Sequence, residues 1–303
     1  MESESGNYPI QVLCRVMEVH RSVYYAYLQR KNQAPTEAEQ RHREQVKECF
    51  YLHRRRYGAR RIAKELKIGR LRTRRLMKEQ SLEAIQPKSY VPRTTDSRHG
   101  GRISPNLLKD NPLEVKQQGQ VMVGDITYLA LSNGKFCYLA TYQDKYTRRI
   151  VGWAIREEMT AELVVSALQM GLRRGLIGKN AIIHTDRGSQ YVADSYREVL
   201  SGHELRQSMS GKGNCYDNAQ AESFFARFKT ELVEGGGFED VGQARSETFS
   251  YIEGYYNRIR RHSGIGYLSP LEFEKELAKK EKGQEEKRTK KEERSVSFVS
   301  CGT

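Results

Sequence analysis

Three carboxylates stand in three different sequence settings, and together they could perform metal-assisted chemistry. Asp125 lies in VMVGDITYLAL, Asp186 follows the apolar run of IIHTDRGSQY, and Glu222 lies in NCYDNAQAESFFARFKTEL. Carboxylate oxygens are hard ligands that suit Mg²⁺ and similar ions, which also coordinate phosphate oxygens. If folding brings the three residues together, the sequence predicts a site for two divalent cations that could cut and join nucleic-acid strands.

Short apolar runs indicate which elements would position the first two carboxylates. Three runs rich in β-branched and aromatic residues, separated by turn signals, predict a three-stranded meander at residues 121–131, 135–142 and 148–155. Residues 160–174 then have apolar side chains at helical spacing, and residues 181–184 form a compact apolar strand. A strand, a crossover helix and a further strand favour an α/β fold with a mixed sheet and flanking helices. Asp125 is then expected on a central strand, and Asp186 just beyond the end of its neighbour.

The third carboxylate is expected on a helix that begins near Asn218. Glu222, Phe225, Lys229 and Leu232 recur at intervals of three or four residues, so they share one helix face. The Asp-Asn pair before the helix offers an N-cap. This spacing lets Glu222 lean over the strand ends while Phe225 anchors the same face to the sheet.

These motifs resemble those of the DDE transposases of the IS3 insertion-sequence family, whose catalytic core is retroviral-integrase-like with a ribonuclease H-like fold. The resemblance rests on DITYL around Asp125, HTDRGSQY around Asp186, SMSGKGNCYDNAQAESFF leading into Glu222, and YYNRIRRHSGIGYLSPLEFE over residues 255–274. Thirty-five residues separate Asp186 from Glu222, as in that family. Met122 stands where many members carry Trp, which concerns local packing rather than the carboxylates.

The resemblance implies an enzyme, a polynucleotidyl transferase that cleaves DNA strands at element ends and transfers them to target DNA. Asp125, Asp186 and Glu222 would be its catalytic and metal-ligating residues, and two Mg²⁺ or Mn²⁺ ions its cofactors. Lys229 matches a basic residue of the family and would hold a DNA phosphate near the site. Because two ends must be joined, a homo-multimer on DNA is expected. Fusion to, or assistance by, an upstream-frame protein is a further implication.

The positive charge of the chain is concentrated ahead of the predicted sheet. The 303 residues carry a formal charge of +14. Residues 41–93 hold 17 Lys and Arg against 5 Glu, whereas residues 116–231 hold 15 Lys and Arg against 12 Asp and Glu. A basic module beside a nearly balanced domain is typical of a dedicated DNA-binding element, whose binding weakens steeply with salt.

Within the basic module, residues 57–82 show two helical stretches joined near Ile68 and Gly69, with Leu71 among the apolar residues of the second. The pattern is similar to the helix-turn-helix region ahead of the family's core, the second helix being the candidate groove reader. A basic helical hairpin that only follows the DNA backbone is the alternative. The candidate DNA-contacting residues of the whole chain are Arg60, Arg61, Arg70, Arg72, Arg74, Arg75, Lys212, Lys229, Arg258 and Arg261.

Two of these candidates come from other segments. Lys212 belongs to SGKGN, a glycine-rich basic loop that could cradle a phosphate or become ordered when DNA arrives. Arg258, together with Arg260, Arg261 and His262, is expected to extend the DNA surface after the core.

The predicted organisation has five parts. They are a helical, basic, helix-turn-helix-like DNA-binding region at residues 1–86, a Pro-rich linker at 87–114, a ribonuclease H-like integrase core at 115–233, a C-terminal helical extension at 234–274, and a charged tail at 275–303 that forms either a frayed helix or a disordered segment.

Cysteine and hydropathy patterns bear on compartment and metal content. Five scattered cysteines without C-x-x-C fit free thiols in a reducing compartment. His42, Cys49 and His53 suggest a zinc finger, but no second cysteine of suitable spacing completes it, so zinc is not expected. No signal peptide or membrane-length apolar run is visible. We therefore expect a cytoplasmic, chromosome-associated protein without a membrane partner.

Two alternative functions stay open at this point. The chain could be a catalytically idle DNA-binding regulator derived from a transposase, although three intact carboxylate motifs argue against that. It could also be a plain nuclease of the ribonuclease H fold, which would break strands but never yield joined products.

Overall fold

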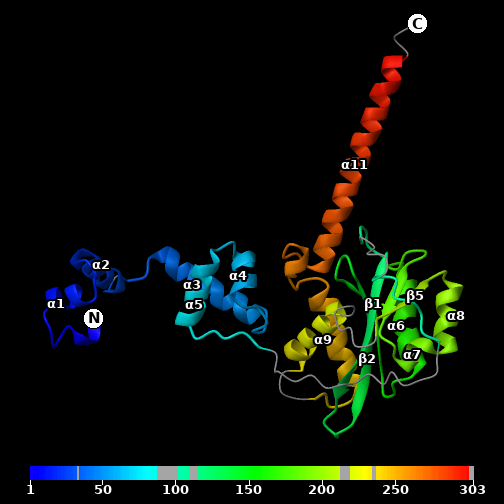
Figure 1. Ribbon diagram of the computed structural model, residues 1–303, viewed down its shortest axis with the longest axis horizontal. Helices are drawn as coiled ribbons and strands as arrows, with labels where there is room; N and C mark the ends of the chain where they lie inside the picture. Colours follow the sequence, from blue (N-terminus) through cyan, green and yellow to red (C-terminus); the bar gives the residue numbers. More distant parts are fainter. Residues whose placement is uncertain (33, 87–101, 110–114, 212–218, 234–236, 300–303) are drawn as a thin grey trace. The chain divides into compact units, whose positions relative to one another are not determined.

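The computed structural model describes residues 1–32, 34–86, 102–109, 115–211, 219–233 and 237–299 (Figure 1). The chain divides into two compact units, Met1–Ala84 and Ile85–Thr303, and each is described by itself. Lys212 and the Asp-Asn pair proposed as the N-cap before Ala219 lie outside the described residues.

The first unit is helical. After a short 3₁₀ turn, η1 (Glu2–Glu4), it contains α1 (Ile10–Val16), α2 (Arg21–Asn32), α3 (Glu37–Leu52), α4 (Ala59–Leu66) and α5 (Arg70–Glu79). Helix α3 begins where the Thr36 side chain accepts the Glu39 N–H at 3.2 Å, and Glu37 and Glu39 also favour this positive helix end. Helices α3, α4 and α5 pack against one another around buried apolar side chains such as Phe50, Ile62 and Leu76.

Leu71 does not occupy the buried position that the sequence predicts, because 80% of the residue is exposed. Thr73 faces inward instead, and its hydroxyl donates to the Gly69 carbonyl at 3.1 Å. Thr73, Leu76 and Met77 recur at helical spacing and are buried, whereas Leu71, two residues before Thr73, is rotated by about 200° from it. The outward face of α5 is therefore formed largely by basic side chains and Leu71.

The second unit is built on a five-stranded mixed sheet. Its strands are β1 (Val121–Ala130), β2 (Phe136–Asp144), β3 (Ile150–Arg156), β4 (Ile182–Thr185) and β5 (Arg206–Met209), in the order β3-β2-β1-β4-β5. The first three pair antiparallel, and β4 and β5 continue parallel to β1. The predicted meander, mixed sheet and central position of β1 are confirmed, and the architecture is ribonuclease H-like.

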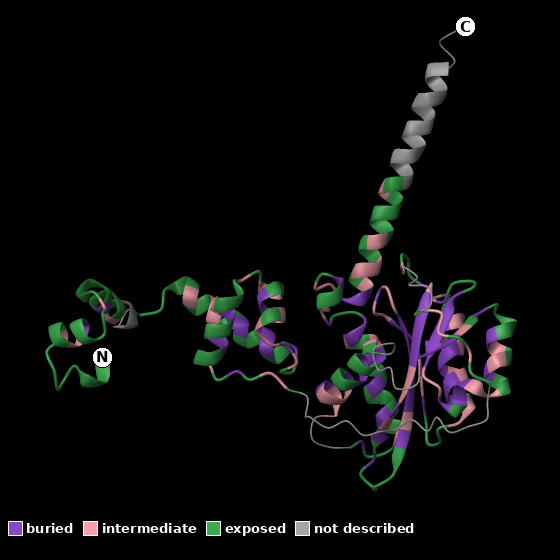
Figure 2. Ribbon diagram, viewed as in Figure 1, coloured by how far each residue is buried: buried purple, intermediate pink, exposed green. Residues whose placement is uncertain are grey.

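Helices cover both faces of this sheet. One face carries α6 (Ala161–Arg173), α7 (Ser189–Val192) and α8 (Asp194–Gly202), and the other carries α9 (Ala219–Leu232), α10 (Val241–Phe249) and a π-helical segment, η3 (Ser250–Tyr256) (Figure 1). Side chains of β2 alternate between two cores, Ala140 and Tyr142 on the α6 side, Cys137 and Leu139 on the α9 side. The buried strands thus lie in the middle of a three-layer sandwich (Figure 2).

Strand β2 includes Gln143 and Asp144, which the sequence placed in a polar connection. Both are buried because the fold satisfies their polar atoms. The Asp144 carboxylate accepts backbone N–H groups from Gly119 at 2.6 Å, Tyr146 at 2.8 Å and Thr147 at 2.7 Å. Asp144 is thus a turn-fixing residue, as expected for a carboxylate outside the three motifs.

Gly152 permits the close packing of α6 on the sheet. A Cβ atom at this position would lie 2.1 Å from the Ala167 carbonyl oxygen and 2.9 Å from the Gly171 nitrogen. Since both are backbone atoms, the helix would have to move away from β3. We expect Gly152→Ala to lower the free energy of unfolding by about 3 kcal/mol, measured by urea denaturation.

Gly254 provides the matched control for Gly152, because nothing lies within 4 Å of a Cβ added there. Gly254→Ala should leave the stability unchanged or raise it slightly through helix propensity. Equal stability of the two variants would contradict the packing interpretation.

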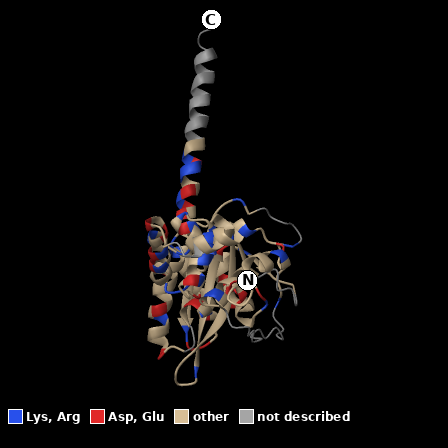
Figure 3. Ribbon diagram, turned by 90° about the vertical axis from the view of Figure 1, so that its left-hand side faces the viewer, with Lys and Arg blue, Asp and Glu red and all other residues tan. Residues whose placement is uncertain are grey.

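The C-terminal helix extends beyond its predicted end. After the 3₁₀ turn η4 (Ser263–Ile265), α11 spans Pro270–Val299, where a frayed helix or disorder was expected from residue 275. Ser269 and Glu272 form a capping box: Glu272 accepts the Ser269 N–H at 2.8 Å and Ser269 accepts the Glu272 N–H at 3.4 Å. Lys and Glu have high helix propensity, and both kinds of charge occur along residues 270–284 of α11 (Figure 3), where the i, i+4 spacing of Glu276 and Lys280 favours a helix without an apolar stripe.

Part of the predicted linker belongs to the second unit. Residues 102–109 lie along β5, where the Met209 N–H donates to the Pro105 carbonyl at 3.3 Å and the Leu107 N–H to the Ser208 hydroxyl at 3.0 Å. Separately, none of the helices in the described ranges has the length and apolar character needed to span a membrane.

Candidate active site

Asp125 and Asp186 are brought together by the register of two parallel strands. Val121 of β1 pairs with Ile182 of β4, and Val123 pairs with His184. Extending this register by two residues places Asp186, just after β4, opposite Asp125. Neighbouring strands lie about 4.8 Å apart, and in-register residues of parallel strands present their side chains to the same face. The predicted positions of these two carboxylates are confirmed.

The two carboxylates line one cavity of ≈ 320 Å³. Asp125 is half-buried, and its Oδ1 accepts the Ile126 N–H at 2.8 Å. Asp186 is also half-buried, and its Oδ1 accepts the Gly188 N–H at 3.0 Å. The remaining lining residues are Ile126, Thr127, Tyr128, Phe136, Tyr138, Met159, Gly188, Ser189 and Gln190.

Glu222 lies in the first turn of α9, which packs against β1. Two contacts fix the helix along the strand. Gln220 Nε2 donates to the Asp144 carbonyl at 3.1 Å near the start of β1, and Lys229 Nζ lies 4.0 Å from the ring centroid of Tyr128. Glu222 falls between these contacts and is exposed, as a residue reaching over the sheet would be. Phe225 is buried in the core of this face, as predicted.

The electrostatics of Asp125 show that its neighbourhood has excess negative charge. Loss of water around the carboxyl, and then the nearby charges of Asp186 and Glu222, raise the pKa of Asp125 from 3.8 to about 8. The Ile126 N–H and the Lys229 ammonium oppose this rise without cancelling it. Three hard oxygen donors with uncompensated charge fit a divalent cation.

This raised pKa makes the stability of the metal-free protein depend on pH. The folded state keeps a proton on Asp125 that the unfolded chain releases, so this stabilisation is complete below pH 3.8 and is lost as pH rises to about 8. Asp125→Asn removes the titrating group. In EDTA, we expect the variant to gain about 3–4 kcal/mol over the parent between pH 5 and pH 8, measured by urea denaturation.

Asp194→Asn is the control for that pH experiment, because Asp194 is exposed at the start of α8. Its stability curve should follow that of the parent. Parallel curves for the parent and Asp125→Asn would show that Asp125 ionises normally.

Lys229 is a member of the proposed DNA-contacting set whose charge acts on Asp125. Its ammonium lies over the face of Tyr128, a cation–π contact, and it lowers the pKa of Asp125. Burial in turn lowers the pKa of Lys229. The side chain is half-buried, so its charge is held at the edge of the site rather than extended into solvent.

The two residues flanking Asp186 have internal partners. His184 is fully buried within β4, with Nδ1 2.9 Å from the Ser208 hydroxyl. Arg187 donates through Nε to the Ser210 carbonyl at 2.9 Å.

The arginines of the predicted helix-turn-helix region lie on α4 and α5, joined by Lys67, Ile68 and Gly69. Arg60, Arg70, Arg74 and Arg75 are exposed, and Arg61 and Arg72 are half-buried. Arg75 forms ion pairs with Glu39 and, at 3.5 Å, with Glu79. Internal pairs of this kind make Arg75 the weakest of the six candidates.

The arginines after the core separate into different roles. Arg258 is exposed, whereas Arg261 is half-buried and donates to the Tyr267 carbonyl at 3.0 Å. Arg260 was expected on the DNA surface, but it is only 2% exposed and pairs with buried Glu231. The three arginines of residues 258–261 thus do not form one surface, because Arg260 points inward to Glu231 of α9.

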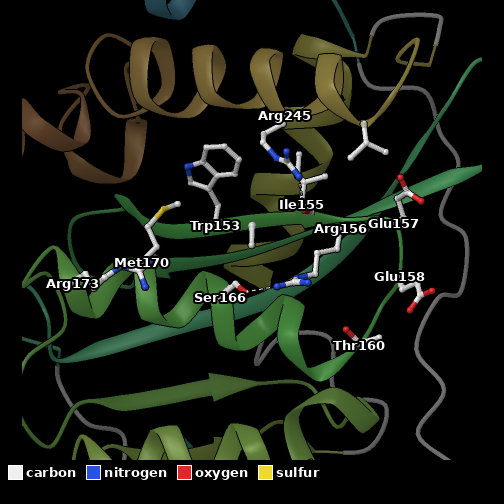
Figure 4. A pocket seen from close by; sticks show the side chains of 12 residues that line it. Trp153, Ile155, Arg156, Glu157, Glu158, Thr160, Ser166, Met170, Arg173 and Arg245 are labelled. Carbon is white, nitrogen blue, oxygen red and sulfur yellow. Dashed lines mark hydrogen bonds between the residues drawn. The ribbon is translucent and has the colours of Figure 1, made fainter.

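A second cavity, of ≈ 650 Å³, lies between β3, α6 and α10 (Figure 4). Arg156 donates to the Ser166 hydroxyl at 3.2 Å and Arg245 to the Ile155 carbonyl at 3.5 Å. Glu157 and Glu158 also line it, so charges of both signs are present. The three predicted catalytic carboxylates are not among its lining residues.

Several residues of the carboxylate cavity were not singled out from the sequence. Tyr128 follows Asp125 by three residues and contacts Lys229, and Gln190 donates to the Met159 carbonyl at 3.1 Å across the cavity wall. The HTDRGSQY motif contains Gln190, which could have been noticed there. Met159 comes from the β3–α6 connection, for which the sequence carries no signal.

The comparisons with known proteins agree with the motifs. Residues 115–215 and 203–270 match two models described as "Integrase core domain". "Transposase InsF for insertion sequence IS3A" of Escherichia coli (strain K12) is 38% identical over 281 residues, covering 90% of this chain and 96% of that protein. "Insertion element IS600 uncharacterized 31 kDa protein" of Shigella sonnei is 40% identical over 266 residues, covering 86% of this chain and 97% of that protein.

Among solved structures, the chain is similar to one in a simian T-cell lymphotropic virus intasome in complex with PP2A regulatory subunit B56 gamma. The sequence identity is 13% and the TM-score 0.44, and the match covers 75% of this chain and 73% of that chain. The HTLV-2 integrase catalytic core domain in complex with magnesium has 11% identity and a TM-score of 0.37, and the match covers 52% of this chain and 96% of that domain. The sequence relatives carry the assignment: this chain belongs to the IS3-family insertion-sequence transposases.

Proposed function

We propose that this transposase cleaves DNA strands at the ends of its element and joins them to target DNA, using Asp125, Asp186 and Glu222 and two Mg²⁺ or Mn²⁺ ions. The observation that carries the proposal is the shared position of the carboxylates. The β1–β4 register sets Asp186 opposite Asp125, and the charge of Glu222 adds to the rise in the pKa of Asp125 that loss of water and Asp186 cause.

The donor set matches the proposed metal. Three carboxylates supply only oxygen ligands, which hard cations prefer, and their number leaves coordination positions for water and substrate phosphate. Bound divalent cations would activate the attacking hydroxyl and stabilise the leaving oxygen during in-line displacement. Water as nucleophile gives strand cleavage, and a DNA 3′-hydroxyl gives strand joining.

The protein's own contribution is to hold the reacting groups in place. Asp125 belongs to the central strand, and Asp186 is fixed by its bond from the Gly188 N–H, so both are attached to the rigid sheet. Glu222 is carried by α9, whose phenylalanines pack on the same sheet. Lys229 would contact the phosphate backbone as a point charge beside the carboxylates.

Replacing Lys229 tests its proposed contact. Lys229→Met keeps much of the apolar stem but removes the charge, so we expect weaker DNA binding and a slope of log K against log salt reduced in magnitude by about 1. Fluorescence anisotropy at several salt concentrations would measure both. Lys179→Met, at an exposed site away from α9, is the control, and an unchanged slope for Lys229→Met would remove Lys229 from the contact surface.

The remaining DNA contacts are proposed on charge and exposure. Exposed arginines of α4 and α5, with Arg258, are available to phosphates, and Lys212 is retained from the sequence alone. Recognition of bases by α5 is the finer proposal. Since two ends must be held together, the active form is proposed to be a homo-multimer on DNA, with an upstream-frame product as a further component.

The test uses purified protein, Mg²⁺, and duplex oligonucleotides carrying the element ends with a supercoiled target plasmid. Nicked ends together with end–target joined products are expected. Breaks without joined products would favour a plain nuclease, and binding without breaks would favour the idle regulator. Repeating the reaction with Mn²⁺ and with EDTA tests the metal dependence separately.

A further inference from the structure

A second group of metal-ligating side chains lies in the helical unit, on residues separate from the three carboxylates. The sulfur of Cys49, a ring nitrogen of His53 and a carboxylate oxygen of Glu65 all lie within 4.8 Å of one another. Cys49 and His53 are buried, and Glu65 is half-buried. The sequence offered His42 as the third residue and predicted no zinc site, but the fold supplies Glu65 instead.

Helix geometry places the first two residues on one face. Cys49 and His53 are four residues apart at the end of α3, and the His53 N–H donates to the Cys49 carbonyl at 3.2 Å. One helical turn therefore separates them, and both side chains project toward α4. Glu65 comes from the last turns of α4, with its Oε1 3.1 Å from His53 Nε2.

The His53 ring is held in a fixed orientation. Its face stacks on Tyr57, with ring centroids 3.7 Å apart and an interplanar angle of 11°. Its edge meets Glu65. Because this stacking limits rotation of the ring, little side-chain entropy would be lost when the ring accepts an ion in place of its contact with Glu65.

The connection between α3 and α4 is strained in a way that serves the cluster. Arg54 and Arg55 have φ of 49° and 62°, so two consecutive residues with side chains adopt the left-handed region. This region is unfavourable for a residue with a side chain, because the Cβ atom comes too close to the following carbonyl oxygen. This turn reverses the direction of the chain between α3 and α4, so that Glu65 of α4 lies next to His53. Strain of this kind persists where the surroundings impose it, often at functional sites.

The chemistry of the three donors selects a particular class of metal. A thiolate, an imidazole and a carboxylate suit Zn²⁺ and disfavour Mg²⁺, which prefers oxygen alone. The charges of the two anionic donors would balance the ion, so the buried site would be neutral.

We propose that Cys49, His53 and Glu65 bind one zinc ion that links α3 to α4, with water as the fourth ligand. Zinc bonds of about 2.0–2.3 Å place tetrahedral ligands about 3.5 Å apart. The donor atoms already lie within 4.8 Å of one another. Side-chain rotations that move them by about 1 Å bring them to this spacing. The zinc site is independent of the proposed DNA chemistry and stabilises the helical unit.

Cobalt titration of the full-length protein tests the proposal, because Co²⁺ bound to a thiolate gives a near-ultraviolet charge-transfer band that carboxylate sites cannot give. One Co²⁺ per chain should produce the band, and Zn²⁺ should displace it. Cys49→Ser should abolish the band, and His53→Gln and Glu65→Gln should each weaken Co²⁺ binding at least about a hundredfold.

Two variants serve as matched controls. Cys14→Ser removes another buried thiol of the same unit, and Asp125→Asn disrupts the carboxylate site; both should keep the full cobalt band. A band that survives Cys49→Ser, or its absence from the parent protein, overturns the proposal. If Asp125→Asn retains the band, the zinc site is shown to bind metal whether or not the carboxylates form an active site.

X-ray absorption at the zinc edge examines the unsubstituted protein and needs no variant to fold. After loading with one equivalent of Zn²⁺, the expected first shell has one sulfur at about 2.3 Å and nitrogen or oxygen ligands at about 2.0 Å. A shell without sulfur would place the metal elsewhere and exclude the proposed site.

Discussion

Asp186→Asn is expected to lower the rates of strand cleavage and strand joining at least about a thousandfold while leaving DNA binding close to that of the parent. The substitution removes one negative ligand from the carboxylate group, and metal-assisted stabilisation of a phosphoryl transition state supplies several kcal/mol. A loss of about 4 kcal/mol corresponds to that factor. Rates are measured under single-turnover conditions with labelled element ends in Mg²⁺.

The fold should tolerate this substitution, because an asparagine oxygen can still accept the Gly188 N–H that Asp186 now accepts at 3.0 Å. Asp194→Asn makes the same substitution at an exposed position of the catalytic domain and should retain full activity. Cleavage by Asp186→Asn at the parent rate would exclude Asp186 from the chemistry. A parallel loss of DNA binding would instead indicate a structural role.

The positions of the first two carboxylates could be predicted because they depend on local patterns. Alternating and continuous apolar runs identify β1, β2, β3 and β4, and the crossover helix between β3 and β4 makes β4 parallel to β3 and therefore to β1, beside which it lies. The offset between Asp125 and Asp186 then follows from strand register alone. Glu222 could be assigned to a helix by its spacing, but its level along β1 depends on contacts from Gln220 and Lys229 that no local pattern encodes.

The misplaced residues share a physical cause, which is tertiary context. Leu71 is apolar but falls on the outer face of α5, because Thr73 can be buried once its hydroxyl bonds to Gly69. The zinc site proposed here depends on Glu65, which a sequence search for Cys and His spacing passes over. For the charged segment after residue 275 the pattern left a frayed helix and disorder open, and helix propensity favours the helix that α11 forms.

Arg260 and Glu231 form a buried ion pair that connects α9 to the segment after η3. Arg260 Nε lies 3.1 and 2.8 Å from the two Glu231 oxygens, and Nη2 lies 2.6 Å from Oε1. Tyr251 adds a bond to Glu231 Oε2 at 2.9 Å. Glu231 follows Glu222 by nine residues on α9, so the pair holds the helix that carries the third carboxylate.

Arg260→Met is expected to destabilise the core by about 3–5 kcal/mol, because it leaves the Glu231 carboxylate buried without its cation. Urea denaturation at pH 7 measures the loss. Arg258→Met, two residues away and exposed, should change stability by less than about 0.5 kcal/mol while weakening DNA binding. The double variant Glu231→Leu with Arg260→Met should recover most of the stability, since no charge is then left in the core. If Arg260→Met instead lost DNA affinity with unchanged stability, Arg260 would belong to the DNA surface after all.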